Sequence, residues 1–303
     1  METILTYSAD SGLARELVSA GRLLGTVKAL ALDEAAAGEL AACGTDVLRY
    51  DGTGIIPADT AAVAQVIALA AEKAGASVVL LGSDRRGKEL AGRLAMLLDA
   101  GCLTDVKTLS LEGGSINCTR LSFGGATISA ECITSPVKII AISPANFNRA
   151  EPAETGSIEG FDGAVAASVT LISARAKESE GVDLKAAEVI VAVGEGVSEE
   201  NIKVADKLAA ALGGVLACSK PIATDRHFLS EERVIGLSGV ICKPELALVI
   251  GISGQAQFTV GVRDAKTIIS INTDKNAPIN YMADYYLVKD SGAAIAELCE
   301  KLA

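Results

Sequence analysis

The sequence predicts an α/β protein of two doubly wound domains, each built on a mostly parallel β-sheet. Short apolar runs alternate with Ala-rich segments of helical period in both halves of the 303-residue chain. A charged stretch without apolar periodicity, residues 175–183, separates the two series and is the expected linker. In the second half, glycine turns follow buried runs, as in Rossmann-like nucleotide-binding domains. We therefore expect one domain over residues 1–180 and another over residues 181–303.

The N-terminal half begins with a regular alternation of strands and helices. Five-residue apolar runs bounded by turns are typical of strands buried on both faces. The expected strands are residues 3–7, 27–32, 47–50 and 77–81, and the expected helices are residues 10–24, 33–42 and 61–74. Asp59 or Thr60 is placed to cap the last of these helices.

The pattern changes after residue 105, where helical periods stop. Short β-type runs follow at residues 106–109, 116–120, 126–130 and 137–142. The pairs Gly113-Gly114 and Gly124-Gly125 separate the first three runs, which favours hairpins and an antiparallel extension of the sheet. One further strand is expected at residues 166–172.

The loop after residue 81 carries Arg85, Arg86 and Lys88 and feeds a helix. It has two interpretations, a phosphate or partner-docking loop and a solvated loop with an ordinary helix cap. We favour the second, because the glycine and lysine order of a P-loop is missing.

The C-terminal half restarts the α/β alternation. Strands are expected at residues 189–193, 215–218, 246–250, 267–271 and 285–288, with a helix over residues 202–212 that Ser198 caps. A strand, glycine turn, helix and strand follow one another over residues 246–272. Gly251 and Gly254 let a ligand approach the backbone, and Ser253, Gln257 and Asn272 supply polar groups there. This stretch predicts a cradle for a nucleotide-like cofactor.

Composition excludes several classes of protein. The net charge of −11 argues against nucleic-acid binding, which needs a basic surface. No run of 18 apolar residues is free of polar interruption, and residues 1–10 lack the features of a signal peptide, so we expect a cytoplasmic protein that is not membrane-embedded. Seven scattered cysteines without a CxxC pair predict reduced thiols, mostly in the core. The single histidine, His227, disfavours histidine metal sites and a serine-hydrolase triad.

Short motifs then recur along the second half in a fixed order. They are Gly194-x-Gly196, Cys218-Ser219-Lys220-Pro221, residues 234–239, Pro244-Glu245-Leu246, residues 251–254 with Gln257, residues 271–274, Ala277-Pro278-Ile279 and Ala283-Asp284-Tyr285. In this order they resemble the flavin-binding domain of the electron-transfer flavoprotein alpha subunit. The N-terminal half adds a looser match at Gly82-Ser83, Gly87, Ala91 and Leu94.

The resemblance implies a C-terminal FAD-binding domain and a nucleotide alpha-hydrolase-like N-terminal domain. It implies that a beta subunit pairs with the chain, that an acyl-CoA-type or other dehydrogenase donates electrons, and that a quinone-linked oxidoreductase accepts them. Ser253 and Gly254 are then expected at the FAD pyrophosphate, Asn272, Thr273 and Asp290 at the adenosine end, and Ser238 and Lys220 at the flavin ring. The full expected set of cofactor-binding residues is Ser219, Lys220, Ile235, Gly236, Leu237, Ser238, Gly239, Gly251, Ile252, Ser253, Gly254, Gln257, Phe258, Asn272, Thr273 and Asp290.

Three positions depart from the family pattern. Glu195 and Lys220 stand where the family commonly has arginines, and Phe258 stands where many members have a histidine. A loss of fixed cations and of one donor predicts weaker stabilisation of the negatively charged reduced ring, and therefore a lower flavin potential.

Two other functions stay open on the sequence alone. The first is an FAD- or AMP-binding regulatory or assembly subunit without redox turnover, which the arginine replacements make worth keeping. The second is an NAD-dependent dehydrogenase, which the incomplete GxGxxG fingerprint and the lack of an acid–base pair disfavour. An electron carrier needs no catalytic residue of its own, so none is predicted.

Overall fold

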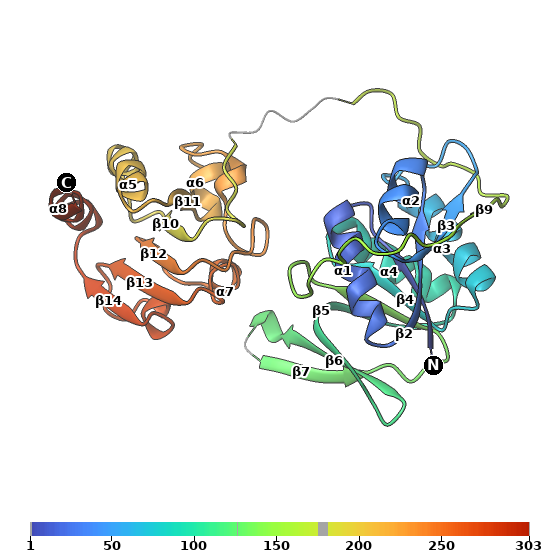
Figure 1. The fold of residues 1–303 in the computed structure, drawn as a ribbon. Coiled ribbons are helices and arrows are strands. Elements are labelled where there is room, and N and C mark those ends of the chain that lie inside the picture. Colours follow the sequence, from blue (N-terminus) through green and yellow to red (C-terminus); the bar gives the residue numbers. More distant parts are fainter. Residues whose placement is uncertain (1, 126, 175–180, 303) are drawn as a thin grey trace. The chain divides into compact units, whose positions relative to one another are not determined.

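The computed structural model describes residues 2–125, 127–174 and 181–302 and divides the chain into two compact units (Figure 1). Unit 1 is Met1–Ala174 and unit 2 is Arg175–Ala303. Most of the expected linker, residues 175–180, lies outside the described residues. The predicted fold class, α/β with mostly parallel sheets and an antiparallel part in the first, is confirmed.

Unit 1 is built on a nine-stranded sheet of order β7-β6-β5-β8-β4-β1-β2-β3-β9. Its strands are β1 (Glu2–Tyr7), β2 (Gly25–Ala31), β3 (Asp46–Tyr50), β4 (Val78–Gly82), β5 (Gly101–Glu112), β6 (Ser115–Ser122), β7 (Thr127–Cys132), β8 (Lys138–Ile142) and β9 (Ile158–Phe161). Its helices are α1 (Ser11–Arg22), α2 (Glu34–Ala41), α3 (Thr60–Ala74), α4 (Arg85–Leu97) and the 3₁₀ turn η1 (Phe123–Gly125).

Each α-helix of unit 1 begins at an aspartate. The carboxylates of Asp10, Asp33, Asp59 and Asp84 accept from backbone N–H groups three residues on, at 2.7–3.1 Å. This is the usual way in which a short acidic side chain satisfies a helix N-terminus. Because Asp84 caps α4, the loop after β4 has the ordinary helix cap that the sequence favours.

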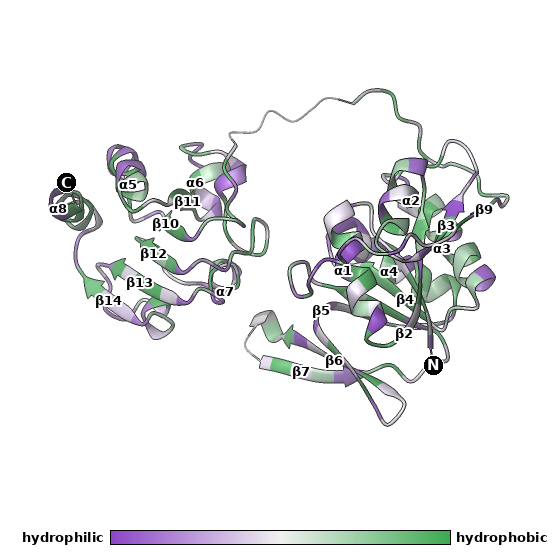
Figure 2. Cartoon of the chain, viewed as in Figure 1, coloured by the Kyte–Doolittle hydropathy of each residue, from purple (hydrophilic) through white to green (hydrophobic). Residues whose placement is uncertain are grey.

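The core of unit 1 follows the two-residue period of its strands. Leu5 joins a cluster with residues of α3 and α4, such as Ile67 and Leu94, whereas its neighbour Ile4 joins a cluster with Leu17 of α1. Opposite faces of the sheet are therefore buried under different helices. In Figure 2 the central strands are mostly green, and the helices carry both green and purple residues.

The predicted antiparallel extension is confirmed, and it is joined to the sheet through β5. The first half of β5 pairs in parallel with β8 and its second half pairs antiparallel with β6, with an irregularity between Val106 and Thr108.

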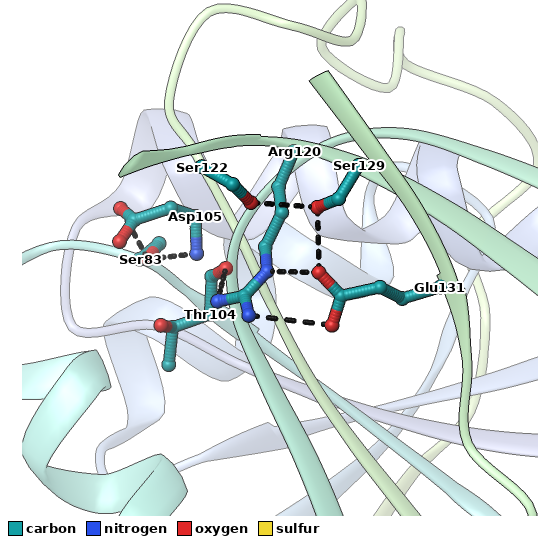
Figure 3. Close-up of polar contacts among 7 residues, drawn as sticks. All are labelled: Ser83, Thr104, Asp105, Arg120, Ser122, Ser129 and Glu131. Atoms are coloured by element: carbon teal, nitrogen blue, oxygen red, sulfur yellow. Dashed lines mark hydrogen bonds and ion pairs between the residues drawn. The ribbon is translucent and has the colours of Figure 1, made fainter. Parts of the chain in front are cut away.

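A polar network lies across this extension (Figure 3). Arg120 of β6 donates to both carboxylate oxygens of Glu131 on β7, at 2.8 and 3.3 Å, and to the Thr104 carbonyl at 3.5 Å. Ser129 donates to the same carboxylate at 2.6 Å. The Arg120 guanidinium holds the pKa of Glu131 below its usual value. The network therefore ties β7 and β6 to the start of β5.

The expected strand at residues 166–172 is wrong, because this segment is irregular. The edge strand is instead β9, which pairs with β3 in parallel. The backbone N–H groups of Ser168 and Val169 donate to the buried carboxylate of Asp59, at 2.6 and 2.9 Å. Those donors serve a helix-capping side chain and not a neighbouring strand.

Unit 2 is built on a five-stranded sheet of order β11-β10-β12-β13-β14, in which every pair is parallel. Its strands are β10 (Val189–Val193), β11 (Val215–Cys218), β12 (Leu246–Ile250), β13 (Thr267–Asn272) and β14 (Tyr285–Val288). Its helices are α5 (Glu199–Ala211), α6 (Lys220–Thr224), α7 (Ala256–Thr259) and α8 (Ser291–Leu302), with 3₁₀ turns η2 (Glu231–Arg233) and η3 (Pro278–Tyr281). Ser198 caps α5, as the sequence predicts.

The helix expected between β12 and β13 is present as α7, which has only four residues. In a longer helix the carbonyl of Gln257 would accept from the N–H of Gly261. Here that carbonyl accepts from Leu237 N–H at 2.8 Å, and Gly261 N–H bonds Phe258 at 2.9 Å. A tertiary contact to residues 235–240 therefore ends the helix.

Two further findings concern the whole described chain. Within residues 2–125, 127–174 and 181–302, no helix combines the length and apolar character needed to span a bilayer. The seven cysteines are free thiols, and Cys43, Cys118, Cys218 and Cys242 are buried.

Candidate functional site

A cavity of about 530 Å³ lies at the carboxyl ends of the unit 2 strands. Because the sheet is parallel throughout, the loops that follow β10, β11, β12 and β13 meet at this edge. The lining residues are Glu195, Gly196, Ser219, Lys220, Pro221, Ile235, Ser238, Gly251, Ile252, Ser253, Gln255, Gln257, Phe258, Asn272, Asp274, Ala277 and Pro278.

Glycine backbones pack directly against each other on one wall. Gly196 N–H donates to the Gly251 carbonyl at 3.0 Å, and a Cβ on Gly194 would lie 2.5 Å from that same oxygen. Gly251 has φ +64°, a left-handed conformation that suits glycine. The turns after β10 and β12 therefore approach as closely as backbone allows, and side chains at these positions would fill the wall.

A second wall comes from the segment after β11. Ile235 N–H donates to the Cys218 carbonyl at 3.0 Å, which continues the edge of the sheet, and Gly236 turns with φ +125°. A Cβ on Gly236 would lie 2.2 Å from the Gln257 carbonyl. This contact brings the exposed Ser238 to the cavity beside Gln257 and Phe258.

Comparison with known proteins identifies the family. A model of the electron transfer flavoprotein FAD-binding domain matches residues 183–263, and a model of the electron transfer flavoprotein domain matches residues 11–166. Protein FixB of Escherichia coli O7:K1 (strain IAI39 / ExPEC) and Protein FixB of Escherichia coli (strain 55989 / EAEC) are each 40% identical over 232 residues, covering 75% of this chain and 74% of the relative. The chain belongs to the electron-transfer flavoprotein alpha-subunit family.

The alpha subunit binds FAD and works with a beta subunit as an electron carrier, which confirms the expected function and cofactor. The regulatory alternative without redox turnover is not favoured. The cavity is compatible with FAD, since its volume lies within the range of about 300–1,000 Å³ that is usual for cofactor sites. Its glycine wall also carries no side chains that would occupy the space of a bound cofactor.

The alpha subunit brings most of the predicted residues to this cavity. The lining set includes Ser219, Lys220, Ile235, Ser238, Gly251, Ile252, Ser253, Gln257, Phe258 and Asn272. The predicted residues outside the lining set are Gly236, Leu237, Gly239, Gly254, Thr273 and Asp290.

Three of those outside the lining are glycines that shape the loops. Gly254, with φ +89°, lies so close to Ile279 that a Cβ would sit 2.2 Å from its backbone nitrogen. Gly239 likewise lies against the Val234 carbonyl. Leu237 is 61% exposed and contributes its N–H to Gln257.

Asp290 and Thr273 have different surroundings. The Asp290 carboxylate accepts from Ala293 N–H at 3.0 Å and so caps α8. Thr273 is exposed beside Asn272. Their assignments to the adenosine end stay predictions.

Several lining residues are outside the predicted set. They are Glu195, Gly196, Pro221, Gln255, Asp274, Ala277 and Pro278. Most of them belong to the quoted family motifs, so their place in a motif at a strand end could have predicted that they line the cavity. Gln255 precedes α7 and belongs to no quoted motif, so the sequence carried no signal for it.

The charges on the cavity wall are unevenly distributed. Glu195 and Asp274 place carboxylates there, and Lys220 places one ammonium group at the start of α6. All three residues are exposed. The Lys220 carbonyl accepts from the Thr224 hydroxyl at 3.1 Å, whereas its ammonium group has no hydrogen bond or ion pair within the described residues. Phe258, by contrast, is 6% exposed and packs in a core cluster with Ile252 and Val262. The site is thus a polar opening over an apolar floor.

Proposed function

We propose that this cavity is the FAD site of the alpha subunit, and that the predicted residues hold the cofactor along it. The proposal is supported above all by the meeting of four strand-end loops around one space with a glycine wall. The bound FAD supplies the redox chemistry, and the protein supplies binding, orientation and electrostatics.

The backbone of residues 251–254 and the Ser253 hydroxyl are assigned to the pyrophosphate. Small residues and free N–H groups suit an anion at a strand end. Asn272, Thr273 and Asp290 are assigned to the adenosine end, where polar side chains recognise ribose and base. We propose residues 181–303 as the domain that carries these contacts, with residues 1–180 as the second domain.

The loop of Ser238 is assigned to the flavin ring. In this assignment the Ser238 hydroxyl donates a hydrogen bond to a ring nitrogen, and the Lys220 ammonium stabilises negative charge on the ring. Phe258, Ile235 and Ile252 keep water from one face of the flavin ring. A lysine is a flexible point charge, so its stabilisation of the reduced ring is weaker than that of a stacked arginine.

The partners other than the beta subunit are those that the family resemblance implies. We propose that an acyl-CoA-type or other dehydrogenase supplies electrons, that a quinone-linked oxidoreductase receives them, and that the exchange takes place in the cytoplasm. The acidic net charge of −11 favours partners with basic docking surfaces.

A cavity-filling variant tests the site. Ser253→Trp places an indole in the cavity from an exposed position, and we expect the heterodimer to purify without visible flavin absorbance. The matched control is Ala210→Trp, an exposed position in the last turn of α5, at the opposite end of the strands. The control should keep its flavin bands, and these should bleach with a reducing partner. Wild-type flavin content in Ser253→Trp would refute the assignment of the cavity.

A further inference from the structure

Two polar side chains lie behind the cavity wall and are not among its lining residues. Ser270 of β13 is completely buried, and its hydroxyl donates to the side-chain oxygen of Asn280 in η3. A buried hydroxyl on a sheet strand requires such a partner, because an unpaired one is costly. Ser270 therefore fixes the position of the Asn280 amide.

The nitrogen of that amide holds the neighbouring loop. It donates to the carbonyls of Asp274 and Lys275, both at 3.2 Å. Two carbonyls can only accept, so the orientation of the amide is set by its surroundings. The same loop carries Asp274, Ala277 and Pro278 to the cavity wall.

The loop is also bonded to the opposite wall of the cavity. The side-chain oxygen of Asn272 accepts a hydrogen bond from Asp274 N–H at 3.0 Å, and its side-chain nitrogen donates to the Ile252 carbonyl at 2.9 Å. Ile279 N–H donates to the Ser253 carbonyl at 3.1 Å. Asn272 before the loop and Ile279 after it thus connect the loop to the turn after β12. The Asn280 amide holds the part of the loop that lies between these two connections.

We infer that Asn280, seated by Ser270, is a positioning residue for FAD binding. It acts through the backbone of Asp274 and Lys275, which sets the separation of the two walls, and makes no contact with the cofactor. The inference rests on the proposed cofactor site. Supporting groups of this kind matter because a wall displaced by about 1 Å no longer matches a rigid ligand.

Two isosteric substitutions in one loop test the inference in the full alpha–beta heterodimer. Asn280→Asp keeps an oxygen for Ser270 but replaces the donor with a second oxygen, which then faces two carbonyls. Asn276→Asp adds the same charge to the same loop at an exposed side chain and is the matched control. We expect the Kd for FAD, measured by flavin fluorescence, to rise about tenfold or more for Asn280→Asp and to stay within about twofold for Asn276→Asp.

A second readout separates positioning from simple loss of stability. The visible circular dichroism of bound flavin at saturating FAD reports the surroundings of the ring, and we expect it to change in Asn280→Asp. Equal Kd values and equal spectra for the two variants would overturn the inference.

Ser270→Ala keeps the test decisive if Asn280→Asp does not fold. It removes one hydroxyl, frees the amide to turn, and should weaken FAD binding by several-fold. A Kd within about twofold of wild type would overturn the inference. Normal flavin content in Ser253→Trp would instead refute the cavity assignment itself, and the inference with it.

Discussion

Substitution of Gly254 by alanine gives a sharp test of how the cavity is built. Gly254 has φ +89°, where residues with a side chain are strained by about 1–3 kcal/mol. The added Cβ would also lie 2.2 Å from Ile279 N and 2.6 Å from its Cα, well inside the 3.4 Å at which ordinary contact begins. Because these are backbone atoms, the loop of residues 277–279 must move by about 1 Å.

Gly213 provides the matched control. It ends α5 with φ +68°, and a Cβ there would meet no atom within 4 Å. Gly213→Ala therefore reports backbone strain without a clash, at a cost of about 1 kcal/mol. Gly254→Ala combines strain with overpacking, and we expect it to cost about 2–4 kcal/mol of unfolding free energy.

The assay is urea unfolding of the heterodimer together with a flavin fluorescence titration. We expect the Kd for FAD to rise at least tenfold in Gly254→Ala, because Ala277 and Pro278 line the cavity and move with Ile279. Gly213→Ala should keep wild-type affinity. The reasoning is refuted if Gly254→Ala matches Gly213→Ala in both stability and affinity.

The remaining predictions concern acid stability, the sheet extension and the flavin potential. Hydrogen bonds from Ser168 hold the pKa of Asp59 at about 2, so the stability that its carboxylate contributes is complete above about pH 4 and is lost as pH falls toward 2. Asp59→Asn should therefore make the unfolding free energy less dependent on pH between about 4 and 2. An unchanged pH dependence of the unfolding free energy would contradict this. Arg120→Ala leaves Glu131 in a half-buried network and should cost about 1–2 kcal/mol in urea unfolding, whereas Arg93→Ala breaks an exposed pair and should cost less than about 0.5 kcal/mol. Lys220→Met removes a cation from the cavity and should lower the flavin potential by roughly 40 mV in a redox titration. Lys220→Gln is the polar control with the same loss of charge. A rise in flavin potential in either variant would exclude the role of Lys220 in stabilising the reduced ring.

Local patterns were sufficient for the regular elements. Most apolar runs of unit 1 and unit 2 became strands, although β7 and β14 are largely exposed. The aspartates or serine before helices became caps. Both features depend on neighbouring residues alone. The segment at residues 166–172 failed for a different reason. Its alternation is compatible with a strand, but its N–H groups bond Asp59, which is more than a hundred residues away in sequence.

Some residues of the site could likewise be predicted from local patterns, and others could not. Motif positions at strand ends predicted Ser219, Ser253 and Asn272, because parallel strands bring their carboxyl ends to one edge. The length of α7 was not predictable, since the Gln257 carbonyl accepts from the distant Leu237 N–H. The lining by Gln255 was not predictable either, since Gln255 belongs to no quoted motif.

The sequence alone thus determined the α/β class, the flavoprotein family and the strand ends where the cofactor domain opens. Those properties depend on short-range periodicity and on motifs that lie within a few residues of each other. Only the tertiary structure decided which polar groups line the cavity and which, such as Ser270 and Asn280, support it from behind. The reason is that a hydrogen bond between distant segments depends on how the loops pack, and no local pattern records that packing.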